Sequence, residues 1–182
     1  MKLQFFGLLT TIIASVFAKQ TEQEAGQSIR KIVGNDSNII LSIFSESDAM
    51  PVGISVYYVS TDACEGVASD GDPIIVLREG GYLERNFNIN KKISLTLTEN
   101  NGKTPLFSDS AILFGGLSKI EQSEELKKCF LKAHPDAGAW VPGPSNLNQY
   151  YRYHISKIFQ FAGAGSSSYL GFVDPKYYYT VG

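Results

Sequence analysis

The chain has 182 residues, of which 43% are hydrophobic and 12% aromatic, and its 16 basic and 18 acidic residues leave a formal net charge of −2. This composition supplies enough apolar surface for one folded domain, and it excludes an intrinsically disordered chain. Lysine and arginine gather in no basic patch along the sequence, so the composition also argues against a nucleic-acid partner.

The N-terminal residues predict a cleavable secretory signal peptide. Met1 and Lys2 give a short positive start, and an apolar stretch of about 15 residues follows, which is shorter than the roughly 20 residues that cross a bilayer. Small Ala18 predicts cleavage before Lys19, so residues 1–18 form the signal peptide and residues 19–182 the mature domain. The alternative is an uncleaved anchor, which the polar residues after the stretch disfavour. No second long apolar stretch follows, and we expect no stable membrane span.

The signal peptide predicts a secretory destination, either extracellular or vacuolar and lysosomal. In that compartment three further residues can be modified. Cys64 and Cys129 can form a disulfide in an oxidising compartment, or they can be a loop thiol and a buried helix residue. Asn35 begins the glycosylation sequon Asn-Asp-Ser, which we place in a surface turn after a helix. Two cysteines without a matching histidine cluster predict no zinc site.

The first half of the mature domain predicts one helix followed by strands. Thr21 and Glu24 form a capping box, and apolar residues then recur at helical spacing up to Gly34. A turn at Gly80-Gly81 is typical of a hairpin. The predicted strands span residues 38–45, 52–60, 73–78 and 92–98, where apolar residues either alternate or form a short branched run.

The second half continues the pattern. Ser123 begins a helix that ends at His134-Pro135. The pair Gly115-Gly116 inside a strand predicts a bulge or a close backbone approach. Tyr177 to Tyr179 are interpreted as a binding platform or as a terminal strand that packs on the barrel. The predicted strands span residues 111–120, 150–161 and 169–173.

About six or seven strands that follow one another through short links predict a mainly β, α+β fold. Because helices do not alternate with the strands, the order favours an antiparallel barrel or sandwich with peripheral helices over a βαβ array.

No catalytic motif occurs in the sequence. No serine lies in a Gly-x-Ser-x-Gly elbow, and no zinc-protease or nucleotide-loop pattern is present, so we predict no catalytic residue and no metal site. His134 is interpreted as a cation at a helix end, with a ligand or proton carrier in a cleft as the alternative. His154 lies in a strand and is expected to face solvent or a dimer partner.

Several segments, taken in order, resemble one known family. They are residues 25–33, 40–45 and 90–97, Arg85-Asn86, Ala133-His134-Pro135 with Trp140, and Tyr178 after the closing strands. Together they resemble the CREG-type secreted glycoproteins, a branch of the pyridoxamine 5'-phosphate oxidase-like, FMN-binding split barrels. Two positions depart from the family pattern. Val141 intervenes between Trp140 and Pro142, and Ser145-Asn146 stands where a second histidine is expected.

The resemblance implies a six-stranded antiparallel split β-barrel and a homodimer. It also implies a non-catalytic protein that acts through binding, with a degenerate flavin site and no cofactor, and with an unidentified protein or glycan partner. The alternative is an FMN-dependent oxidoreductase, for which Arg78, Arg85, Lys91 and His134 are the candidate cofactor-binding residues. A haem-binding protein is the third hypothesis, with His134 and His154 as candidate ligands.

Overall fold

The computed structural model describes residues 19–35, 38–100 and 102–180. The predicted signal peptide, residues 1–18, lies outside the described residues, which begin at Lys19. The helices are α1 (Glu22–Asn35), α2 (Tyr82–Asn90), α3 (Glu124–Ala133) and α4 (Pro175–Tyr179), and short 3-10 turns are η1 (Thr61–Ala63), η2 (Pro105–Phe107) and η3 (Pro135–Ala139). The strands are β1 (Asn38–Phe44), β2 (Pro51–Ser60), β3 (Pro73–Arg78), β4 (Ile93–Thr98), β5 (Ser110–Lys119), β6 (Asn148–Phe161) and β7 (Gly171–Val173).

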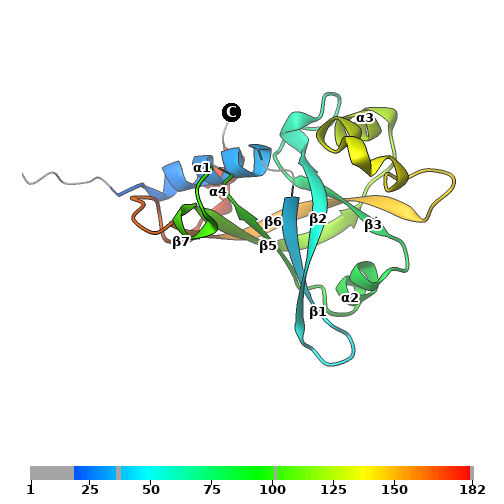
Figure 1. The fold of residues 1–182 in the computed structure, drawn as a ribbon, viewed down its shortest axis with the longest axis horizontal. Coiled ribbons are helices and arrows are strands. Elements are labelled where there is room, and N and C mark those ends of the chain that lie inside the picture. The colour runs from blue at the N-terminus through cyan, green and yellow to red at the C-terminus, as the bar shows by residue number, and fades with distance from the viewer. Residues whose placement is uncertain (1–18, 36–37, 101, 181–182) are drawn as a thin grey trace, which may run out of the picture.

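Six strands close into an antiparallel barrel in the order β3-β2-β1-β4-β5-β6, because β3 also pairs with β6. The short strand β7 extends the sheet beyond β6 (Figure 1). The predicted six-stranded split barrel with peripheral helices is therefore confirmed. Within the described part of the chain, no helix has the length and apolar character needed to cross a bilayer.

The barrel is split between β2 and β3. These strands pair only where Tyr58, Val59 and Ser60 face Ile75, Ile74 and Pro73. The rest of β2 pairs with β1 alone, and β3 continues to Arg78 against β6 alone. Two strands that start side by side thus separate, and the gap between them positions the candidate site.

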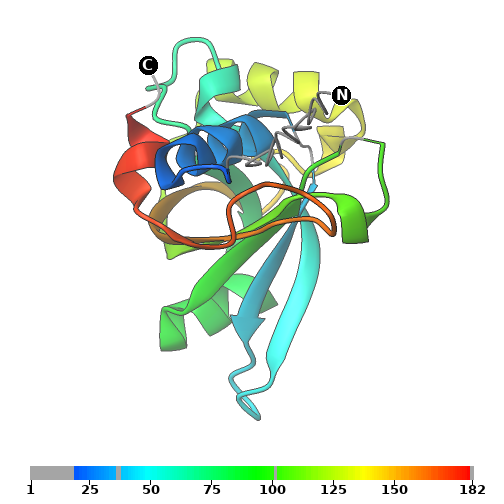
Figure 2. The ribbon, with the colours of Figure 1, turned by 90° about the vertical axis from the view of Figure 1, so that its left-hand side faces the viewer.

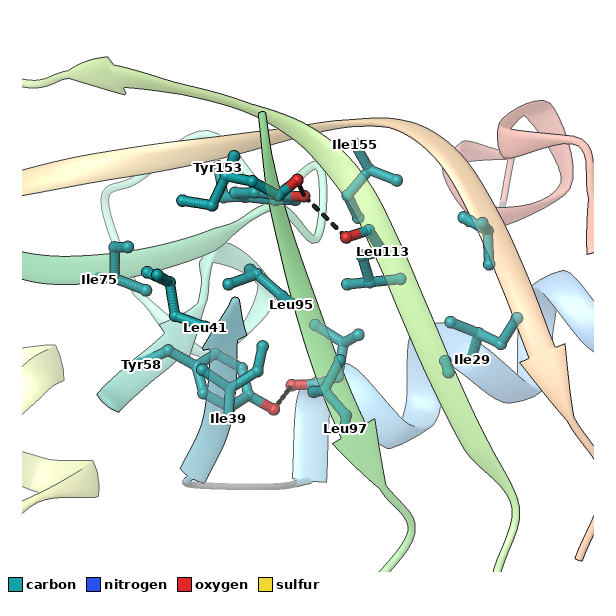
Figure 3. Close-up of a cluster of buried hydrophobic side chains, with 14 of the residues drawn as sticks. Ile29, Ile39, Leu41, Tyr58, Ile75, Leu95, Leu97, Leu113, Tyr153 and Ile155 are labelled. Atoms are coloured by element: carbon teal, nitrogen blue, oxygen red, sulfur yellow. Dashed lines mark hydrogen bonds between the residues drawn. The ribbon is translucent and has the colours of Figure 1, made fainter. Parts of the chain in front are cut away.

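Alternating apolar residues fill the barrel. Ile93, Leu95 and Leu97 point inward from β4, and Ile39, Leu41 and Ile43 do so from β1, as expected from the alternation of apolar residues along these strands. Figure 3 shows Ile39, Leu41, Leu95 and Leu97 converging with Tyr58 and Tyr153. The buried Tyr153 hydroxyl donates to the carbonyl of Leu113 at 2.7 Å, so this polar group is satisfied within the core.

Helix α1 covers one end of the barrel together with α4 (Figure 2). Its predicted capping box is present, since the Thr21 amide donates to Glu24 Oε2 at 2.8 Å and the Glu24 amide donates to Thr21 Oγ1 at 3.3 Å. On its other side, Arg30 makes a bidentate ion pair with Asp62 in the loop after β2. The first helix therefore fixes both the barrel end and the loop of residues 61–72.

Strand β3 is buried on both faces. Ile75 and Leu77 point into the barrel, whereas Ile74 packs into a second apolar cluster beneath α3. That cluster includes Leu126 and Phe130 of α3. In Figure 1, α3 and α2 lie on the same side of the molecule, flanking β3.

Two predicted elements are wrong. Gly80-Gly81 does not close a hairpin but leads directly into α2, whose buried residues Asn86 and Phe87 hold it against the barrel. Tyr177 to Tyr179 form neither a strand nor a flat platform but belong to α4. The Asp174 side chain accepts the amide of Lys176 and Pro175 occupies the first turn, so helix-start signals override the β-propensity of tyrosine.

Candidate functional site

A cleft of about 940 Å³ opens at the split in the barrel. Residues 54–57 of β2 and residues 76–78 of β3 form two of its walls. The start of α2 and the segment from Ala139 to Asn148, which follows α3, complete it. The cleft exists because β2 and β3 separate after three residue pairs, which leaves room for a ligand between them.

Aromatic side chains dominate the exposed wall of this cleft. Trp140 is 64% exposed, and Tyr82 and Tyr57 are also exposed to solvent. Tyr57 is held rigidly, because its ring stacks on His134 with centroids 4.4 Å apart and its hydroxyl donates to Asp136 Oδ2 at 2.5 Å. This hydrogen bond raises the pKa of Tyr57 above its ordinary value, so the hydroxyl stays neutral. The cleft thus presents pre-positioned aromatic surface.

The asparagine side chains of the cleft wall make hydrogen bonds within the protein. Asn146 Nδ2 donates to the carbonyl of Val141 at 2.9 Å, and Asn148 Nδ2 donates to the carbonyl of Trp140 at 2.7 Å. The Asn148 amide in turn donates to Asn146 Oδ1. These bonds fold the segment back on itself and fix Trp140, so a ligand meets few uncommitted polar groups there.

Arg78 is the one charged side chain among the described residues that line the cleft. It lies at the end of β3, where the strand emerges from the barrel and the side chain is exposed. A guanidinium at the edge of an aromatic wall suits a ligand that carries one anionic group.

The structure does not bring the four predicted cofactor-binding residues together. Only Arg78 lines the cleft. Arg85 donates to the carbonyl of Gly80 at 2.8 Å on the outside of α2, and Lys91 caps the end of that helix near Asn88. His134 is 2% exposed and its Nε2 lies 2.8 Å from the carbonyl of Tyr58.

His134 lies at the C-terminal end of α3, as the sequence predicts, but its side chain is buried. Its backbone amide caps α3 by donating to Phe130, but its ring points into the barrel wall, toward a carbonyl of β2. The ring therefore braces Tyr57 from behind and does not itself reach the cleft. His154 is exposed on β6, as expected, and does not line the cleft.

Cys64 and Cys129 are joined in a disulfide, with their Cα atoms 5.3 Å apart. The bond ties the loop after β2 to α3, whose Phe130 forms part of the cleft wall. Asn35 is the exposed last residue of α1, and the other two residues of its sequon lie outside the described part. Among the described residues, no group of three metal-ligating side chains is close enough to hold an ion.

The sequence did not reveal the aromatic wall as a set. Tyr57, Tyr82 and Trp140 come from three different elements, and only the separation of β2 from β3 brings them to one cleft. Trp140 alone stood out beforehand, through the family resemblance.

The fold and its split define a protein of the split-barrel class, and the comparisons with known proteins agree. The family model described as CREG, beta-barrel matches residues 20–180. The chain therefore belongs to the CREG β-barrel family. Among curated proteins, none matches the sequence.

Solved structures with the same fold include a haem-binding protein from Mycobacterium smegmatis, at 16% identity and a TM-score of 0.67. The match covers 85% of this chain and 59% of the mycobacterial protein. A FAD-binding protein from Mesorhizobium loti is 16% identical with a TM-score of 0.53, over 74% of this chain and 91% of that one. The haem storage protein HutZ from Vibrio cholerae is 11% identical with a TM-score of 0.51. The match covers 78% of this chain and 99% of HutZ. At these identities the likeness concerns the fold alone.

Proposed function

We propose that this is a secretory-pathway glycoprotein, extracellular or vacuolar and lysosomal, whose split cleft acts by binding a flat aromatic ligand with one negative charge. The observation that carries the proposal is the cleft wall itself. Rigid Tyr57 and exposed Trp140 offer stacking surface, and Arg78 offers the single cation. Such a site binds through burial of apolar area and one charge-assisted hydrogen bond.

Flavin mononucleotide fits this wall only in part. Its ring system suits the aromatic surface, and the amides at the start of α2 add partial positive charge beside Arg78. The phosphate, however, carries about two negative charges near neutral pH. Glu84, in the first turn of α2, already places a carboxylate there, where its Oε2 accepts the Gly80 amide at 2.8 Å. We therefore infer a degenerate flavin site and keep the FMN-dependent oxidoreductase as the alternative.

Haem fits the cleft less well. Haem iron is usually held by histidine, cysteine, methionine or tyrosine. The described residues that line the cleft include no histidine, cysteine or methionine. Their two tyrosines are Tyr57, whose hydroxyl is committed to Asp136, and Tyr82. Some split barrels of this fold bind haem or FAD, but their ligands do not transfer to this cleft without the matching residues.

The test uses an aromatic monoanion, 1-anilinonaphthalene-8-sulfonate, and FMN, each titrated into the full mature protein. We expect saturable fluorescence of the sulfonate, weakened roughly tenfold by Arg78→Gln because one charge-assisted contact is lost. Trp140→Ala removes stacking surface and should weaken binding further. Lys128→Gln, an exposed cation of α3 outside the cleft, serves as the matched control and should change nothing.

Retention of FMN decides between the two candidates. If a flavin absorption band survives gel filtration and is lost in Arg78→Gln, the cleft holds a dinegative cofactor. That result would favour the FMN-dependent oxidoreductase. Equal sulfonate binding by the wild type and both cleft variants would overturn the cleft as the site.

We also propose that the protein forms a homodimer, as the family resemblance implies, and that it recognises a protein or glycan partner. Light scattering of the mature protein measures the first of these directly.

A further inference from the structure

Three side chains outside the cleft form a hydrogen-bonded chain, two of them on strands β5 and β6 and one in the loop before β3. Ser118 Oγ lies 2.8 Å from Nε2 of His154. Nδ1 of the same ring lies 3.0 Å from Asp72 Oδ2. A serine, a histidine and an acid in this order, each within hydrogen-bond reach, have the geometry of a nucleophile with its base and its orienting carboxylate.

The strand register explains why the serine and the histidine meet. Gly116 is paired with His154 and Ser118 with Arg152, so Ser118 and His154 are diagonal neighbours on one face of β5 and β6. The bulge between Phe114 and Gly115 sets this register. No local motif marks Ser118 and His154, because they lie on strands β5 and β6 and not in a Gly-x-Ser-x-Gly elbow.

Asp72 is held rigidly for the role of orienting acid. Its side chain is 3% exposed, its Oδ1 accepts the hydroxyl of Tyr179 at 2.7 Å, and its amide donates to Asp70 Oδ1 at 3.1 Å. A carboxylate accepts hydrogen bonds, so Nδ1 of His154 carries the proton. Nε2 is then the acceptor that faces the Ser118 hydroxyl, which is the tautomer a general base needs.

Two neighbours complete the arrangement. Arg152 is paired with Ser118 across β5 and β6 and its side chain is 18% exposed. Its Nη1 donates to Asp70 Oδ2 at 2.9 Å. Gly116 is directly opposite His154, and a Cβ added there would meet nothing within 4 Å. The surface beside Gly116 is therefore open, and Arg152 is the cation that we assign to an oxyanion formed at Ser118.

We propose that Ser118, His154 and Asp72 hydrolyse small esters with a short acyl group, at a site separate from the split cleft. Ser118 Oγ attacks the ester carbonyl while its proton passes to His154 Nε2. The bond to the leaving alcohol breaks, and His154 returns the proton to that oxygen. Water then attacks the acyl-serine, gives its proton to His154, and releases the carboxylic acid as Ser118 regains its hydrogen. Arg152 stabilises the oxyanion in both steps.

The site is exposed and has no deep pocket that could bury a long acyl chain. The expected substrates are therefore esters with a short acyl group such as acetyl. None of the five residues Asp72, Gly116, Ser118, Arg152 and His154 lines the split cleft, so the activity is independent of ligand binding there.

The experiment measures hydrolysis of p-nitrophenyl acetate by the full mature protein, and labelling by a fluorophosphonate probe followed by peptide mass spectrometry. We expect the label on Ser118, and we expect Ser118→Ala to lower kcat/KM by roughly 100-fold or more, to the solution background. Ser156→Ala is the matched control, because Ser156 is an exposed serine on β6, the strand of His154, and its hydroxyl donates to the carbonyl of Phe114. It should keep the full rate and the label.

His154→Gln keeps a polar side chain on the exposed surface and should abolish both labelling and hydrolysis with little loss of stability. Asp72→Asn removes a buried carboxylate, so its midpoint of unfolding must be measured beside its rate. A folded His154→Gln protein that hydrolyses the ester as fast as the wild type overturns the proposal, as does a label that falls equally on Ser118 and Ser156. Sulfonate binding in the cleft is unaffected by either result.

Discussion

At the scale of single residues, Gly115 decides how β5 meets β6. A Cβ added there would lie 1.9 Å from the carbonyl oxygen of His154, a distance that no real contact allows. Only glycine therefore permits the close approach at the bulge, which in turn places Gly116 opposite His154 and Ser118 beside it. The prediction of a bulge or a close backbone approach at Gly115-Gly116 is confirmed, with the register shift between Phe114 and Gly115 and the close approach at Gly115.

Gly115→Ala should therefore lower the free energy of unfolding by about 3 kcal/mol, because either the strands must move apart or the bulge must shift. Gly116→Ala is the matched control, since its added Cβ meets nothing within 4 Å and should cost less than about 1 kcal/mol. Urea denaturation of the two variants measures both effects. Equal stability of the two would show that the bulge accommodates a side chain.

At the scale of elements, α3 contributes Phe130 to the wall of the cleft without pairing with a strand of the barrel. It is held by a second apolar cluster, which includes Leu126 and Phe130, and by the disulfide from Cys129 to Cys64. Tyr150 lies in that cluster with a buried hydroxyl, and burial raises its pKa to about 12, so it stays neutral there. The position of Phe130 in the cleft thus depends on packing and on one covalent bond.

Replacing both cysteines by alanine should lower the free energy of unfolding by about 4 kcal/mol, because the bond closes a loop across 65 residues and restricts the unfolded chain. Sulfonate binding in the cleft should weaken as well, since α3 is less firmly placed. Guanidinium denaturation with and without a reducing agent measures the first effect. If reduction leaves the wild-type midpoint unchanged, the bond contributes nothing to stability.

At the scale of the whole molecule, the compartment decides whether the disulfide and the glycan form at all. Expressed with its own leader in a secretory host, the protein should begin at Lys19 and carry a glycan at Asn35. Asn35→Gln should remove the glycosidase-sensitive mass. Asn88→Gln, an exposed asparagine outside any sequon, should keep it. N-terminal sequencing and mass spectrometry measure these outcomes, and a product that retains residues 1–18 would contradict the cleavage.

Local signals were sufficient to predict much of the fold. The capping box of Thr21 and Glu24, the alternation of Ile93, Leu95 and Leu97, and the glycine pair in β5 each involve residues within a few positions of one another. Their geometry is set by the backbone periods of helix and strand, so a single sequence reveals them.

Local signals predict the wrong element where two of them compete. Gly80-Gly81 is typical of a hairpin turn, yet α2 follows. This helix is short, and its buried residues Asn86 and Phe87 become a packed face only through contact with the barrel. The tyrosines of α4 favour a strand in isolation, yet Asp174 and Pro175 start a helix that docks on α1.

By itself the sequence determined the mainly β class, the strands and their inward faces, the first helix and the bulge, because each depends on neighbours along the chain. Only the tertiary structure decided the cleft and the surface chain of Ser118, His154 and Asp72. Ser118 and His154 are 36 positions apart, and Asp72 and His154 are 82 apart. Such contacts arise from strand order and register, which long-range pairing sets and no local pattern encodes.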